Sequence, residues 1–69
     1  MSESVGTELP KEMARVRDVL MPQYADIGPA GGFALALMRR DLDLAAKAMA
    51  EGDVIGMISA YKSLKEYKS

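Results

Sequence analysis

The sequence predicts an all-α protein in which a short, kinked N-terminal helix precedes an α-helical hairpin, a three-helix arrangement that we expect to be oligomeric. Apolar residues recur at spacings of three and four along most of the chain, as in helices that bury one face. Two breaks, at residues 27–32 and 51–53, divide this pattern into segments of helical length. Residues 1–8 are polar and aperiodic, so we expect a flexible tail there and a single helical domain over residues 9–69.

The first helix is predicted over residues 10–21. Pro10 suits the first turn because its φ is already helical, and Glu12 places negative charge near the helix N-terminus. Pro22 should break or kink the helix, since its ring clashes with the carbonyl four residues earlier. An apolar row nevertheless stays in phase across the proline: Met13, Val16, Leu20, Tyr24 and Ile27. We therefore expect a kink and a restart over residues 22–27.

The hairpin is predicted from its turn residues. Gly28 can take a positive φ, and Pro29 can begin a helix but not continue one, so a turn precedes a helix over residues 30–51. Gly52 is typical of the left-handed residue that ends a helix. Asp53 is typical of an N-cap, and we expect it to begin the last helix, over residues 53–67. The two helices should therefore be antiparallel neighbours.

The helix predicted over residues 30–51 has an apolar surface too wide for one neighbour. Turned by 100° per residue, its apolar side chains cover about half of the circumference or more. The last helix has a narrower apolar face, which one neighbour can cover. The apolar surface of the helix over residues 30–51 that one neighbour cannot cover predicts that the chain self-associates or docks this surface onto a larger protein. The expected partner-binding residues are Leu35, Met38, Leu42, Ala45 and Met49.

The size of the chain also favours self-association. A chain of 69 residues buries only about 60% of the surface that its unfolded form exposes, so its stability is marginal. Small domains are often stabilised by disulfides, a structural metal or oligomerisation. Because the sequence contains neither Cys nor His, the first two routes are disfavoured and oligomerisation remains.

Catalysis and metal binding need side chains that this sequence lacks or does not bring together. Without His or Cys, the usual bases and thiolates are missing, and Asp41 and Asp43 point about 200° apart on a helix. The glycines at 28–32 match neither a phosphate loop nor a dinucleotide fingerprint. We therefore predict no catalytic residue, metal ligand, cofactor or small-molecule substrate, and a protein that is not an enzyme. Asp41, alone within the apolar surface, should lie at its edge and pair with Arg15, Arg17 or a lysine.

Nucleic-acid binding is the alternative hypothesis. Arg39, Arg40 and Lys47 could meet phosphates, but the formal net charge is −1 and Asp43 would pair with Lys47 on the same helix face. Membrane association is not expected, because no stretch approaches the roughly 18 apolar residues of a span. The acidic first residues do not resemble a secretory signal, so we expect a cytoplasmic protein.

Two resemblances accompany these predictions. Residues 44–66 resemble one helical hairpin of a tetratricopeptide repeat, although Met57 stands where that repeat usually has a small alanine. A longer set of residues resembles small uncharacterised helical proteins of bacteria and their phages: Leu9, Pro10, Tyr24, residues 27–31, Asp41, Leu42, residues 51–53, Tyr61, Leu64 and Lys65. The second resemblance implies a bacterial or viral cytoplasmic context, with no activity or functional residue attached.

Overall fold

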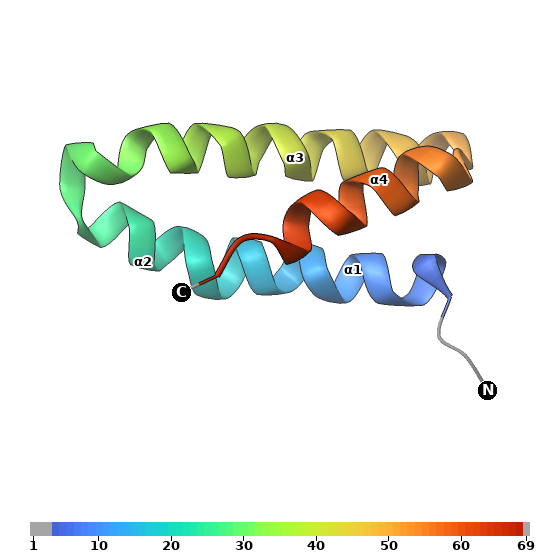
Figure 1. Cartoon of the computed structure of the whole chain (residues 1–69), viewed down its shortest axis with the longest axis horizontal. Coiled ribbons are helices and arrows are strands. Elements are labelled where there is room, and N and C mark those ends of the chain that lie inside the picture. The colour runs from blue at the N-terminus through green and yellow to red at the C-terminus, as the bar shows by residue number, and fades with distance from the viewer. Residues whose placement is uncertain (1–3, 69) are drawn as a thin grey trace.

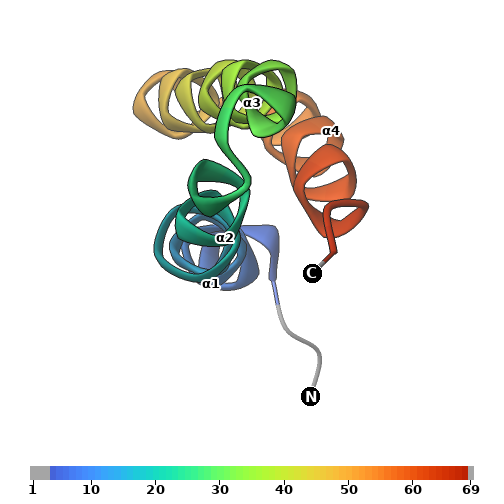
Figure 2. The same ribbon diagram turned by 90° about the vertical axis from the view of Figure 1, so that its left-hand side faces the viewer.

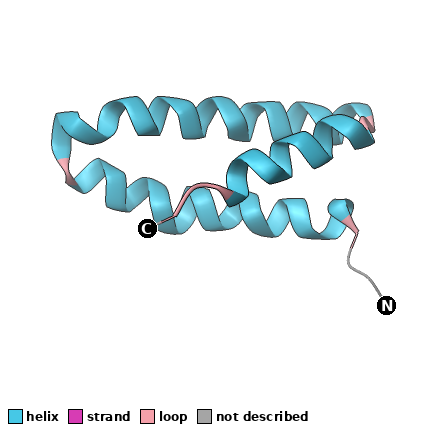
Figure 3. Cartoon of the chain, viewed as in Figure 1, coloured by secondary structure: helices cyan, strands magenta, loops and turns pink. Residues whose placement is uncertain are grey.

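A computed structural model describes residues 4–68, and within this range the chain is helical apart from short loops (Figure 3). The first part of the chain forms one arm, residues 5–26, built from three consecutive helical segments. A single 3₁₀ turn then leads into two antiparallel helices (Figure 1). The segments are α1 (Val5–Arg15), the π-helical η1 (Val16–Leu20), α2 (Met21–Asp26), the 3₁₀ turn η2 (Gly28–Gly31), α3 (Gly32–Glu51) and α4 (Val54–Lys65).

The arm begins earlier than the sequence pattern predicted. Helix α1 begins at Val5, so Pro10 lies inside the helix and residues 5–8 do not belong to a tail. The reason is packing: Leu9 is fully buried and Val5, one turn earlier on the same face, packs against the core. The burial of these two side chains outweighs the backbone hydrogen bond that Pro10 cannot make. Residues 1–3 of the predicted tail lie outside the described residues.

The arm passes Pro22 without a loop. Just ahead of the proline, in η1, the backbone amide of Met21 donates to the carbonyl of Val16, five residues back. This wider π turn accommodates a proline ring that would otherwise meet the carbonyl of Asp18, four residues before it. The predicted restart over residues 22–27 is therefore a local change of hydrogen-bonding pattern in a helix that continues to Asp26.

Two glycines shape the turn between the arm and α3. Gly28 has a φ of 73°, a left-handed conformation that side chains disfavour. Gly31 is buried, and a Cβ at this position would collide with the backbone carbonyl of Tyr24. The chain reverses closely here because neither residue carries a side chain. Helix α3 then begins at Gly32, two residues later than predicted.

The predicted hairpin is confirmed at its turn. Gly52 ends α3 with a φ of 67°, and the carboxylate of Asp53 accepts a hydrogen bond of 3.0 Å from the backbone amide of Gly56. Helix α4 ends at Lys65 and thus covers most of the predicted range 53–67. Viewed from one end, the arm, α3 and α4 occupy the corners of a triangle (Figure 2).

The core lies where the three helices meet. Fully or nearly fully buried side chains from all three fill it: Leu9, Val16, Leu20, Met38, Ala45, Ala60 and Leu64. Three of these are leucines, and burying each contributes about 1.5–3 kcal/mol. The core is therefore small, in keeping with the length of the chain. Within residues 4–68, no helix is long and apolar enough to cross a lipid bilayer.

Candidate interaction surface

The apolar surface of α3 is divided between the core and the outside. Met38 and Ala45 are fully buried, which corrects the expectation that they form part of a partner-binding surface. The reason is that α3 has two neighbours within the chain: α4 on one side, and the arm, which the prediction left unplaced, on the other. Leu35 and Leu42 are half-buried, and 38% of Met49 is exposed.

The three accessible predicted residues form one line, which we call the α3 stripe: Leu35, Leu42 and Met49. They lie seven residues apart, so they share one side of the helix and span about 21 Å along it. The stripe is turned by about 90° from the buried row that contains Asp41 and Ala48. Exposed Ala46 lies beside it, and so small a side chain leaves room for another helix to approach closely.

The opposite flank of α3 borders α4 and carries a shallow groove of about 290 Å³. Small side chains of α4 open this groove, and Leu44, which is 53% exposed, lies at its rim. Gly56 lies close to the carboxylate that caps α4, and a Cβ there would require the Asp53 side chain to shift. The lining residues are Asp41, Leu44, Lys47, Ala48, Glu51, Asp53, Gly56, Ser59, Ala60 and Ser63. The sequence pattern pointed to the other flank and did not predict this groove.

Asp41 is buried, with only 6% of its surface exposed, and its partners differ from those predicted. The hydroxyl of Tyr67 donates a hydrogen bond of 2.6 Å to one carboxylate oxygen, and Arg40 approaches the other at 3.4 Å. Burial raises the pKa of Tyr67 to about 12, with further contributions from the hydrogen bond to Asp41 and from its negative charge. The raised pKa favours the protonated phenol, which is the hydrogen-bond donor to Asp41.

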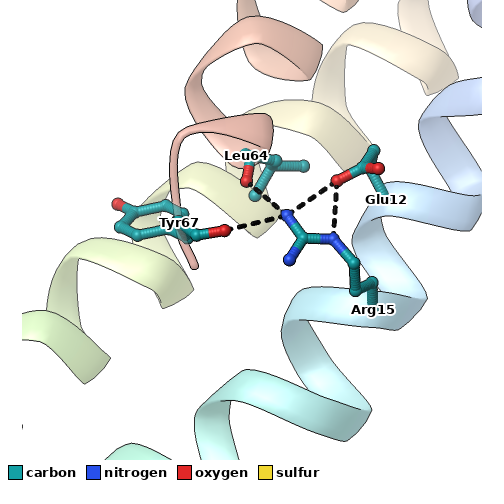
Figure 4. A network of polar contacts seen from close by, with 4 residues as sticks. All are labelled: Glu12, Arg15, Leu64 and Tyr67. Atoms are coloured by element: carbon teal, nitrogen blue, oxygen red, sulfur yellow. Dashed lines mark hydrogen bonds and ion pairs between the residues drawn. The ribbon is translucent and has the colours of Figure 1, made fainter. Parts of the chain in front are cut away.

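Arg15, an expected partner of Asp41, instead binds the end of α4 (Figure 4). Its Nη2 donates to the backbone carbonyls of Leu64 and Tyr67, both at 3.0 Å, while Glu12 holds the guanidinium at 2.9 Å. Carbonyls at the end of a helix lack partners within the helix, and a cation there also interacts favourably with the helix dipole. Arg17, the other arginine considered, pairs with the adjacent Asp18 on the surface.

A second side chain of the arm contacts the C-terminal segment. The hydroxyl of Tyr24 donates to the backbone carbonyl of Lys68 at 3.1 Å. Together with Arg15 and the Tyr67–Asp41 hydrogen bond, this contact ties residues 64–68 to both other helices. No sequence signal indicated these contacts, because each joins residues far apart in the chain.

The basic residues of the nucleic-acid hypothesis lie on the outside of α3 among acidic ones. Arg39 and Arg40 are exposed, but Arg40 pairs with Asp41. Lys47 borders the groove together with Glu51 and Asp53. The surface around these side chains is therefore of mixed charge, and it lacks the concentration of positive charge that phosphate binding uses.

The polar side chains of the described residues were compared with the requirements of a metal site. Residues 4–68 contain no group of three or more acidic side chains placed to hold a metal ion. Every buried side-chain nitrogen and oxygen in the same range has a hydrogen-bond partner. Among the large apolar residues of the described range, Ile55 is 80% exposed and Phe33 is 78% exposed. Both residues lie on the surface, away from the buried core.

No protein-family model, curated protein or solved structure matches this chain.

Proposed function

We propose that this chain is a non-enzymatic interaction protein that pairs with a second copy of itself through the α3 stripe. One observation carries the proposal. Leu35, Leu42 and Met49 keep a seven-residue spacing along a flank of α3 that neither α4 nor the arm fully covers. Side chains seven residues apart stay on one side of a helix, and such a row supplies part of the contact line when two helices pair.

The small size of the core favours a dimer over a monomer. The chain buries few large side chains, and small domains commonly gain stability by burying further apolar surface between copies. We also propose two details that the sequence predicts: a bend of the arm at Pro22, and a cytoplasmic location in a bacterium or in the host of a phage.

A matched pair of substitutions tests the stripe. Leu42→Asp places a charge on the stripe, whereas Leu44→Asp places the same charge at the groove rim, about 160° around the helix. Light scattering after size-exclusion chromatography should report a monomer for Leu42→Asp and the wild-type dimer mass for Leu44→Asp. The same mass for both variants would refute the proposal.

Folding has to be checked in this experiment because Leu42 also packs against the core. Circular dichroism of each variant reports whether the helices remain. Met49→Asp is the second test of the stripe, since this side chain is 38% exposed and lies near the end of α3. It should weaken the dimer while leaving the helical spectrum of the monomer unchanged.

A further inference from the structure

We infer that the two copies pair with their α3 helices antiparallel and with Leu42 of each copy at the two-fold axis. This inference rests on the proposed self-association and adds the direction and register of the contact. Leu35 of one copy would then face Met49 of the other. The stripe fits this arrangement because Leu35 and Met49 are equally distant from Leu42, so reversing the helix superimposes the line of apolar side chains on itself.

Charges beside the stripe determine the direction. Arg39 and Asp43 lie on the outer flank of α3, about 60° and 100° around the helix from Leu42 and away from the buried row. Both are exposed, and within residues 4–68 neither has a hydrogen bond or ion pair. Arg40, by contrast, already pairs with Asp41. The chain thus presents one unpaired charge of each sign along the edge of the stripe.

An antiparallel two-fold sets the outer flank of one helix against the outer flank of the other. Arg39 then lies level with residue 45 of the second copy, about 3 Å along the axis from that copy's Asp43. Two symmetric Arg39–Asp43 pairs can therefore form, one on each side of the axis. The helix dipoles also oppose each other in this arrangement, which is favourable.

A parallel pair gives these charges no partner. A two-fold axis along the helices sets the outer flank of one α3 against the inner flank of the other. On that inner flank, Met38 and Ala45 are already covered within their own chain. Arg39 and Asp43 would lie against these covered side chains, and Asp41, the acidic residue of that flank, is buried and already hydrogen-bonded. The position of the charges thus favours the antiparallel pair.

Single cysteines test the direction, because the natural chain contains none. A disulfide requires Cα atoms about 4.4–6.8 Å apart. Leu42→Cys should therefore link to itself under mild oxidation and give a dimer on a non-reducing gel. Met49→Cys alone should not link, because its two copies would lie about 21 Å apart along the axis. A mixture of Leu35→Cys and Met49→Cys should link. Ala36→Cys, exposed on another side of α3, measures linking by random collision.

The outcomes separate this inference from the proposed function. Self-linking of Leu35→Cys and of Met49→Cys above the Ala36→Cys level would establish a parallel pair and overturn the inference. A dimeric mass with no link at Leu42→Cys would also overturn the register, while self-association would stand. A monomeric mass for the wild-type chain would overturn both.

A charge exchange gives an independent test. Arg39→Asp should weaken the dimer about threefold to tenfold, since two exposed ion pairs are lost and like charges replace them. Adding Asp43→Arg to that variant should restore most of the affinity, because the exchanged charges meet again across the axis. A double variant no tighter than Arg39→Asp would contradict the antiparallel register. Sedimentation equilibrium at low salt measures the dissociation constants.

Discussion

The two ends of α4 are stabilised in different ways. At its N-terminus, Gly52 and Asp53 cap the hairpin with groups adjacent in sequence, and the cap bond from Gly56 spans three residues. At its C-terminus, the carbonyls of Leu64 and Tyr67 are bound by Arg15, a residue of the arm. The first end can form as soon as the hairpin does. The second end forms only when the arm is docked, so it reports on the assembly of the whole fold.

Removing the long-range cap should have the largest effect. Arg15→Met keeps much of the apolar stem but removes the donors to two carbonyls and the pairing with Glu12. We expect the free energy of unfolding to fall by about 2–3 kcal/mol, because hydrogen bonds from charged donors are the stronger class. Urea denaturation followed by circular dichroism measures the change.

Arg17→Met is the matched control for this prediction. Arg17 also belongs to the arm and pairs with an acidic residue, but the pair is exposed and, within residues 4–68, no hydrogen bond joins it to α3 or α4. Its loss should leave the unfolding midpoint unchanged within error. Equal destabilisation by both substitutions would mean that the contact with the end of α4 is unimportant.

The second effect concerns the buried carboxylate. Tyr67→Phe leaves one oxygen of Asp41 without its donor, and an unsatisfied buried group costs about 1–3 kcal/mol. Tyr61→Phe removes a hydroxyl that makes no hydrogen bond within residues 4–68 and should have little effect. Thermal unfolding of the two variants gives the comparison. A larger loss of stability for Tyr61→Phe than for Tyr67→Phe would contradict the role assigned to the Tyr67 hydroxyl.

The local cap should have a smaller effect. Asp53→Ala removes the acceptor for the amide of Gly56, and loss of an N-cap typically costs about 1 kcal/mol. Asp53→Asn keeps an acceptor oxygen and should recover most of this stability in the same denaturation experiment. If Asn and Ala were equally destabilising, the side-chain cap would not be the source of the effect.

The smallest effect is a dependence on alkaline pH. Tyr67 has its pKa raised from the usual 10.0 to about 12, so the folded chain holds this proton more tightly than the unfolded chain. The resulting stability is fully present below pH 10 and is lost as the pH rises through about 12. The difference in stability between the wild type and Tyr67→Phe should therefore shrink over this interval. A constant difference would contradict the raised pKa.

The same contrast explains what could be predicted from the sequence. Gly52 and Asp53 identified the hairpin because their effects on the backbone are local. The same local signals placed the start of the arm too late. Pro10 suits a first helical turn, but the burial of Val5 and Leu9 extends the helix toward the N-terminus, so that it begins at Val5. Spacing alone could indicate Val5, which precedes Leu9 by one turn.

Long-range contacts account for the remaining differences. Helical spacing placed Met38 and Ala45 on the apolar side of α3, but it could not show that the arm would cover them. The partners of Asp41 and Arg15 depend on where the C-terminal segment docks, and no pattern in the sequence encodes that position. Helical periodicity predicts which side chains are apolar on one face, and the packing of a third element decides which of them stay accessible.

The absolute mass of the wild-type chain in solution, measured by light scattering over a wide range of concentration, tests the central claim most directly. A single chain has a mass of 7.5 kDa. Pairing through the α3 stripe predicts a mass that rises with concentration and levels off at twice this value. A mass that stays at one chain throughout the range would contradict self-association.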